Sequence, residues 1–190
     1  MRVRVLDEKL LANGRFRLTL TSAEIVADDG VAHVLRHEIY HYKPAAAVLL
    51  YDPERGCVLL VRQFRLGAYL AGAEQPLTEV CAGMLDDDAP EACVIREAFE
   101  ETGVALLQAT HAFDAFMSPG GMTEKIACFV APYRAADRIG AGGGVDADER
   151  IEIVERPFDE ALAMIANGQI CDAKTIALIY YAKAQGLMAA

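Results

Sequence analysis

The N-terminal part of the chain contains runs that alternate between polar and apolar residues, the pattern of strands with one face against a core and one in water. Arg15–Leu20 alternates in this way, and residues 2–6, 15–26 and 31–42 are predicted as strands. Asp28-Asp29-Gly30 lies between the last two runs and has the composition of a hairpin turn. The pattern therefore predicts an antiparallel sheet over residues 1–43.

From Pro44 onward the apolar runs become continuous. Residues 45–51 and 57–61 are typical of strands that are buried on both faces. We therefore place a domain boundary near residue 43 and expect an α/β domain over residues 44–190. The other elements predicted in this domain are strands over residues 77–82, 104–116 and 125–133, a loop over residues 66–76, and helices over residues 157–167 and from Asp172 to residue 184.

A helix is predicted over residues 89–102, and it places three glutamates on one side, because residues three and four apart are neighbours on a helix surface. These glutamates are Glu97, Glu100 and Glu101. The face expected to meet the core carries Ala92, Ile95, Ala98, Phe99 and Thr102.

Both ends of this helix have suitable residues. Asp88 can cap the start, with Glu91 three residues behind it, and Pro90 is tolerated in the first turn. Gly103 suits the left-handed position past the last turn. The acidic side can be a solvated face. It can also be a site for a hard divalent cation, because three carboxylates at this spacing repel one another unless a positive charge lies among them.

Composition narrows the classes of function. The chain has 190 residues, of which 54% are hydrophobic and 24% charged, which is ordinary for a globular protein. A net charge of −10 argues against nucleic acid or an anionic membrane as a partner. No apolar run approaches the length of a membrane span. Five cysteines without a C-x-x-C pair, and no signal peptide, indicate reduced thiols in the cytoplasm.

His33, His37 and His41 recur every four residues, a spacing that suits metal ligands on a helix. They fall in a segment with strand character, where four residues span about 13 Å. The sequence therefore predicts no shared metal ion at these histidines.

The run from Gly83 to Val104, GMLDDDAPEACVIREAFEETGV, resembles the box of the Nudix hydrolases, G-x5-E-x7-R-E-U-x-E-E-x-G-U, where U is aliphatic. The second half matches from Arg96 to Val104. The first half is one residue shorter than the pattern and has Ala89 at the position of its first glutamate. In the family this glutamate braces the junction between loop and helix, a role that Asp86, Asp87 or Glu91 could take here.

The resemblance implies an α/β/α sandwich with a mixed sheet, to which the N-terminal antiparallel segment is added. It also implies a Mg²⁺ site, with Mn²⁺ as an alternative ion. The expected metal ligands are the Ala82 carbonyl, Glu97, Glu101 and Glu149. The expected catalytic residues are Glu149, Glu100 and Glu101, with Glu149 or Glu100 as the base that takes the proton of water.

Three further segments are similar to the branch of the family that hydrolyses nucleoside diphosphate sugars. They are Gln63-Phe64-Arg65, the loop with Pro119 placed 16 residues after Gly103, and the glycine-rich segment before Asp148. The resemblance implies substrate contacts at Arg65, Glu38, Gly83, Glu124, Asp148 and Lys174. It also implies a homodimer formed through residues 1–43.

Simpler interpretations of these residues remain. Arg65 can be a solvated arginine at a strand end, the glycine-rich segment a flexible acidic linker, and Lys174 an exposed lysine in the first turn of a helix. GDP-mannose is the first substrate that the resemblance suggests, and ADP-ribose is the alternative. A nucleotide-sugar binding module without catalysis is a third interpretation, motivated by Ala89.

Overall fold

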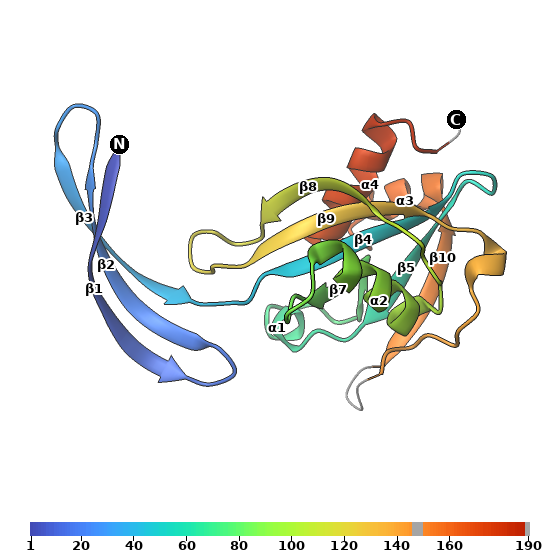
Figure 1. Cartoon of the computed structure of the whole chain (residues 1–190), viewed down its shortest axis with the longest axis horizontal. Helices are drawn as coiled ribbons and strands as arrows, with labels where there is room; N and C mark the ends of the chain where they lie inside the picture. The colour runs from blue at the N-terminus through green and yellow to red at the C-terminus, as the bar shows by residue number, and fades with distance from the viewer. Residues whose placement is uncertain (146–149, 189–190) are drawn as a thin grey trace. The chain divides into compact units, whose positions relative to one another are not determined.

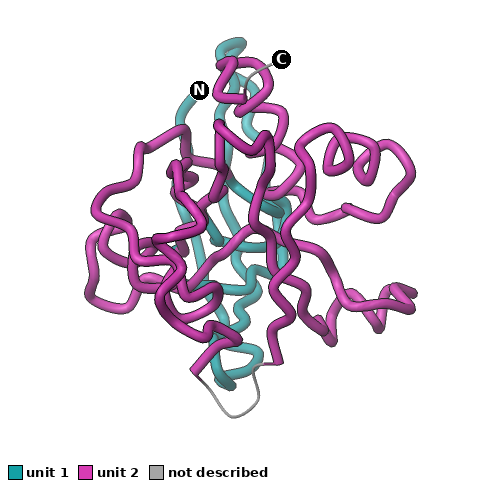
Figure 2. Tube along the Cα trace, turned by 90° about the vertical axis from the view of Figure 1, so that its right-hand side faces the viewer, with its two compact units in different colours: residues 1–44, 116–125 teal, residues 45–115, 126–190 magenta. Residues whose placement is uncertain are grey.

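The computed structural model describes residues 1–145 and 150–188. The chain forms two compact units (Figure 2). The first contains Met1–Pro44 together with Phe116–Lys125, and the second contains Ala45–Ala115 and Ile126–Ala190. No helix in the described ranges is long and apolar enough to cross a membrane.

The first unit is built on a three-stranded antiparallel sheet in the order β1-β2-β3 (Figure 1). Its strands are β1 (Arg2–Asn13), β2 (Arg17–Val26) and β3 (Ala32–Tyr40). β1 is longer than the predicted strand over residues 2–6. Its register against β2 shifts between Val5 and Asp7 and again between Leu10 and Ala12, and such bulges interrupt the alternation from which strands are predicted.

The loop around Pro119 is tied to the end of β3 by backbone hydrogen bonds. Tyr40 N donates to Gly121 O at 2.8 Å, and Thr123 N donates to Tyr40 O at 3.1 Å. The hydroxyl of Thr123 also donates to Tyr42 O at 2.9 Å. These bonds attach the segment after β8 (Thr110–Phe116) to the first unit.

The second unit contains a seven-stranded mixed sheet in the order β10-β5-β4-β9-β8, with β6 paired to β5 and β7 paired to β4. β4 and β9 are parallel, whereas β4 runs antiparallel to β5 and β7. The strands are β4 (Ala45–Asp52), β5 (Cys57–Gln63), β6 (Leu77–Glu79), β7 (Cys81–Met84), β8 (Thr110–Phe116), β9 (Lys125–Pro132) and β10 (Ile151–Pro157). The predicted strand over residues 104–116 starts only at Thr110.

Helices cover both faces of this sheet, as predicted for an α/β/α sandwich (Figure 1). α2 (Pro90–Thr102) packs on β7 and β4, and on the other side α3 (Phe158–Ala166) contacts β10 while α4 (Ala173–Ala184) contacts β4. The core between α2 and the sheet includes Val48, Leu50, Leu59, Val61, Val94 and Ala98. A short 3₁₀ turn lies at Ala135–Asp137.

The loop predicted over residues 66–76 is partly wrong, because the structure has a five-residue helix there, α1 (Leu66–Leu70). Its apolar side chains, Leu66, Tyr69 and Leu70, are exposed. The segment is only five residues long, which is too short for the apolar spacing to mark a helix in the sequence.

Candidate active site

The acidic cluster lies on α2, whose ends differ from the prediction at one residue. Ala89 is the N-cap, with an extended backbone and no side-chain cap, so the prediction that Asp88 caps the helix is wrong. Pro90 occupies the first turn, and Asp88 instead pairs with Arg96 Nε at 3.5 Å. This ion pair ties the shortened loop to the helix. Gly103 closes the helix with a φ of 76°, as predicted.

The buried face of α2 also differs from the expected one. Ala92 and Phe99 are exposed, whereas Glu101 is only 4% exposed. The buried residues are Cys93, Val94, Ala98, Glu101 and Thr102. The apolar pattern pointed to the wrong stripe because the helix turns one of its glutamates inward, toward β7.

Gly83 and Glu97 are in close contact across β7 and α2. A Cβ atom built on Gly83 would lie 1.9 Å from Glu97 Oε1 and 2.2 Å from Glu97 Cδ. Arg96 Nη1 holds the same Oε1 atom at 2.9 Å and also donates to Glu100 Oε2 at 2.9 Å. The missing side chain at position 83 thus provides the space in which the Glu97 carboxylate lies.

Glu101 lies beside Ala82 in the interior. Its Oε2 accepts a hydrogen bond from Ala82 N at 3.3 Å. Burial, followed by the negative charge of Glu97, raises the pKa of Glu101 to about 8. A buried carboxylate whose pKa is raised in part by the charge of a neighbouring carboxylate lies in an environment that favours a bound cation.

The donor set fits a hard divalent cation, which prefers carboxylate and carbonyl oxygens. Among the residues that the structure describes, no group of three or more His, Cys, Asp or Glu side chains is gathered closely enough to hold a metal ion. Three of the four predicted metal ligands are described residues: the carboxylates of Glu97 and Glu101 and the carbonyl of Ala82. The remaining ligand, Glu149, lies outside the described residues, as does Asp148.

The glycine-rich segment before residue 146 is bonded to the C-terminal end of α2. Gly143 N donates to Glu101 O at 2.9 Å, and Gly144 N donates to Glu100 O at 3.0 Å. These bonds satisfy carbonyl groups that the helix leaves unpaired at its end. The described part of this segment is therefore attached to the helix that carries the acidic cluster, in contrast to a free linker.

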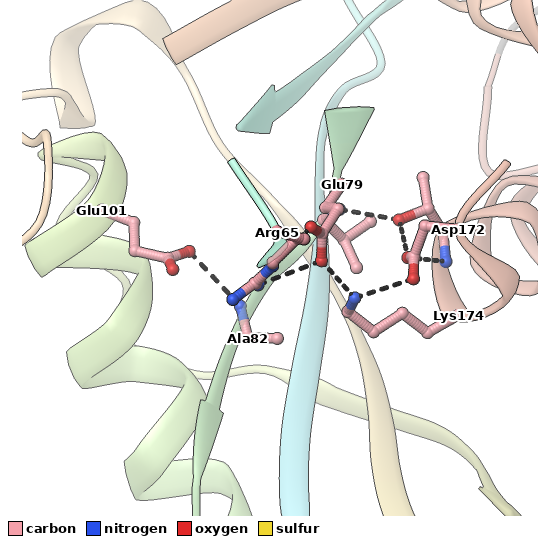
Figure 3. A network of polar contacts seen from close by, with 8 residues as sticks. Arg65, Glu79, Ala82, Glu101, Asp172 and Lys174 are labelled. Carbon is pink, nitrogen blue, oxygen red and sulfur yellow. Dashed lines mark hydrogen bonds and ion pairs between the residues drawn. The ribbon is translucent and has the colours of Figure 1, made fainter. Parts of the chain in front are cut away.

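The two predicted phosphate-binding cations meet at a third residue, Glu79 at the end of β6 (Figure 3). Arg65 Nε and Nη2 donate to Glu79 Oε1 and Oε2 at 2.7 and 3.1 Å. Lys174 Nζ contacts Glu79 Oε2 at 2.5 Å and Asp172 Oδ1 at 3.0 Å. Lys174 is only 8% exposed, so the interpretation as an exposed first-turn lysine is wrong.

A family model described as NUDIX domain matches residues 41–178. The chain belongs to the Nudix family. It is 41% identical over 192 residues to the GDP-mannose pyrophosphatase of Enterobacter sp. (strain 638), covering 100% of this chain and 99% of that protein. It is 44% identical over 191 residues to the GDP-mannose pyrophosphatase of Klebsiella pneumoniae subsp. pneumoniae, covering 99% of this chain and 95% of that protein.

The Nudix fold is also that of a solved structure, the crystal structure of ADP compounds hydrolase. The two superpose with a TM-score of 0.75 at 18% sequence identity, covering 98% of this chain and 97% of that chain. The predicted mixed α/β architecture is thereby confirmed. As a Nudix hydrolase, the protein belongs to a family that generally needs a divalent metal ion.

The structure brings several of the predicted Nudix residues together. Ala82, Gly83, Glu97 and Glu101 meet where β7 and α2 pack, and Arg65 and Lys174 meet on Glu79. Glu38, on β3, and Glu124 belong to the first unit.

Sequence reasoning missed Glu79. It stands in the run Leu77-Thr78-Glu79-Val80-Cys81, and a charged residue within a buried strand was the signal that could have identified it.

Proposed function

We propose that this protein hydrolyses the pyrophosphate bond of GDP-mannose, giving GMP and mannose 1-phosphate, with Mg²⁺ as cofactor. The observation that carries the proposal is the pair of carboxylates, Glu97 and Glu101, next to the guanidinium of Arg65. The chain that carries this site is 41–44% identical over its length to GDP-mannose pyrophosphatases. Such a site combines oxygen ligands for a cation with a guanidinium that matches phosphate oxygens.

The metal ligands in this proposal are Glu97, Glu101, the carbonyl of Ala82 and Glu149. A bound Mg²⁺ supplies charge neutralisation and a water molecule of lowered pKa. Glu149 or Glu100 would be the base that takes the proton of the attacking water. Glu100 Oε2 is held by Arg96 at 2.9 Å, so its use as the base requires that this ion pair opens.

The cations of the site face the phosphates. Arg65 and Lys174 bind the pyrophosphate oxygens and balance the charge that develops on them. Gly83, Glu38, Glu124 and Asp148 complete the proposed substrate contacts.

ADP-ribose, cleaved to AMP and ribose 5-phosphate, is the alternative substrate, because Pro119 and Gln63-Phe64-Arg65 suit that branch equally well. The relatives at 41–44% identity favour GDP-mannose. A binding module without catalysis is a remote alternative, motivated by Ala89. Against it, the Asp88–Arg96 ion pair supports the loop that the family's glutamate would brace.

We further propose that residues 1–43 form the dimerisation segment and residues 44–190 the catalytic domain. Every residue of β1 is exposed, and many of these are large apolar residues. β3 and the turn before it add further exposed apolar residues. The exposed apolar residues of these segments are Val3, Val5, Leu6, Leu10, Leu11, Val31, Val34 and Leu35. Apolar surface on a small sheet of this kind favours a second copy as its cover. Light scattering is expected to give twice the chain mass of 20.6 kDa, and a monomer would contradict the proposal.

The activity is tested by incubating the protein with GDP-mannose, with Mg²⁺ and with EDTA. The Mg²⁺ sample is expected to release GMP and mannose 1-phosphate in equal amounts, and the EDTA sample neither. Glu101→Gln is expected to reduce turnover at least ~100-fold, because it removes one charged metal ligand. Glu160→Gln is the matched control, because its carboxylate pairs with Arg156 Nε at 3.2 Å at the start of α3, away from α2 and β7. Near-normal turnover by Glu101→Gln would reject the proposed metal site.

A further inference from the structure

Glu79 is a buried carboxylate that contacts both cations expected at the substrate phosphates. We propose that Glu79 is a positioning residue, which holds the Arg65 guanidinium and the Lys174 ammonium in the arrangement that receives a pyrophosphate group. The inference rests on the proposed function in taking a pyrophosphate as the ligand. It assigns no contact between Glu79 and the substrate.

The geometry of Arg65 depends on Glu79. Arg65 follows β5 and is the N-cap of the short helix α1, so its side chain is not packed within a regular element. The two-pronged bond to Glu79 uses two of the five N–H donors of the guanidinium. The Arg65 side chain is 43% exposed, so part of it can be reached by a ligand.

Glu79 is itself fixed from the opposite side by the first turn of α4. Lys174 is held by Glu79 and Asp172, and Asp172 Oδ2 accepts from the Thr175 hydroxyl at 2.6 Å. The same hydroxyl accepts a bond from Val80 N at 2.9 Å, next to Glu79 in the chain. The network in Figure 3 thus joins the start of α4 to the strands beside the acidic site.

The charges in the network are all retained. Burial alone would raise the pKa of Glu79, but the hydrogen bond from Arg65 and the charge of Lys174 outweigh it and lower the pKa. Burial would likewise lower the pKa of Lys174, and the charges of Glu79 and Asp172 raise it instead. Buried ion pairs contribute little to stability because their desolvation opposes their attraction. Stability alone is therefore a weak explanation for this arrangement.

Glu79 also competes with the carboxylates of the proposed metal site for the Arg65 guanidinium. Arg65 lies close enough to Glu101 for each charge to shift the pKa of the other. Without the charge of Glu79, the guanidinium would be drawn toward Glu101, a proposed metal ligand. The separation of anion-binding and cation-binding groups thus depends on this one carboxylate.

The test is a double-mutant cycle with Glu79→Gln and Arg65→Ala, read as kcat/KM and as the Kd of inorganic pyrophosphate in calorimetry. Glu79→Gln keeps the shape of the side chain but replaces one acceptor oxygen by a donor. We expect kcat/KM to fall about 10- to 100-fold, because small misplacements of positioning groups have effects of this size. In the Arg65→Ala background the same change is expected to add less than about 3-fold, because residues that act as one unit are not additive.

Glu155→Gln is the matched control. Glu155 receives two bonds from Arg55, which precedes β5. This pair has the same two-pronged form as the Glu79 pair, and its carboxylate is more exposed. We expect its kcat/KM to stay within about 2-fold of the wild type, whatever its effect on melting temperature.

Arg65→Lys keeps the charge but cannot form the two-pronged bond, and it serves if Glu79→Gln does not fold. We expect Arg65→Lys to lose nearly as much as Arg65→Ala. Wild-type kcat/KM in Glu79→Gln, full additivity in the cycle, or wild-type activity in Arg65→Lys would each overturn the inference. If the wild type hydrolyses neither GDP-mannose nor ADP-ribose, the proposed function fails, and the cycle on pyrophosphate binding still decides the role of Glu79.

Discussion

Gly83 and Glu97 share one space: a Cβ atom on Gly83 would lie 1.9 Å from the Oε1 atom of Glu97. The glycine of the box therefore has a packing reason in this protein that is separate from any backbone requirement. The atoms that a methyl group would displace are Oε1, Cδ and Cγ of one flexible side chain, and none belongs to the backbone. Function and stability should respond differently to a change at this position.

Gly83→Ala is expected to leave the melting temperature nearly unchanged, because Glu97 can rotate away from the methyl group. The displaced carboxylate should lower kcat at least ~10-fold and raise the Mg²⁺ concentration for half-maximal activity. Titration of activity with Mg²⁺ measures both. Gly14→Ala is the control, because a Cβ there meets nothing within 4 Å. Wild-type Mg²⁺ dependence in Gly83→Ala would contradict the assignment of Glu97.

Gly103→Ala is expected to show the reverse behaviour. Gly103 has a φ of +76°, and a Cβ there would lie 2.2 Å from the backbone oxygen of Gly140. Neither the left-handed backbone nor the contact can be relieved by a side-chain rotation, so we expect a loss of more than ~1 kcal/mol in the free energy of unfolding. Urea denaturation measures it. A stability equal to that of Gly83→Ala would show that the segment at Gly140 can move away.

The two glycines show what the sequence could and could not provide. The left-handed role of Gly103 follows from its place at the end of a helical pattern. The contact of Gly83 with Glu97 depends on how β7 packs against α2, which no local pattern contains. In the same way, the spacing of apolar residues predicted the length of α2 but not its buried face. The buried face includes Glu101, where an apolar residue would be expected.

The pKa of Glu101, raised from 4.5 to about 8, gives a pH-dependent prediction for the metal-free protein. The folded protein binds this proton more tightly than the unfolded chain, so the stabilisation is complete below pH 4.5 and is lost as the pH rises through about 8. In EDTA, Glu101→Gln should therefore gain melting temperature relative to the wild type between pH 5 and pH 8. A difference that stays constant with pH would contradict the raised pKa.

Thr175 joins α4 to the strand beside Glu79, and it is fully buried. Thr175→Val removes the acceptor for Val80 N and the donor to Asp172, so we expect a loss of about 1–3 kcal/mol in the free energy of unfolding. Thr175→Ser keeps the hydroxyl and serves as the control in urea denaturation. No loss of stability in Thr175→Val, or a loss no larger than that of Thr175→Ser, would contradict the dominant role given to the hydroxyl.

The candidate site was predictable where the chemistry lies in one short segment. Glu97, Glu100 and Glu101 come from one helix, and the resemblance of their segment to the Nudix box identified them together. Glu79 and the burial of Lys174 were not predictable, because their contact joins residues 95 positions apart in the chain. Only the folded protein brings Lys174 of α4 next to Glu79 of β6.

The proposed substrate is tested most directly by one incubation with equal concentrations of GDP-mannose and ADP-ribose in the presence of Mg²⁺, with the products separated by chromatography. GMP and mannose 1-phosphate are expected as the dominant products. Dominant AMP and ribose 5-phosphate would contradict the substrate. The absence of both product pairs, with Mg²⁺ and with Mn²⁺, would contradict the proposed hydrolase activity itself.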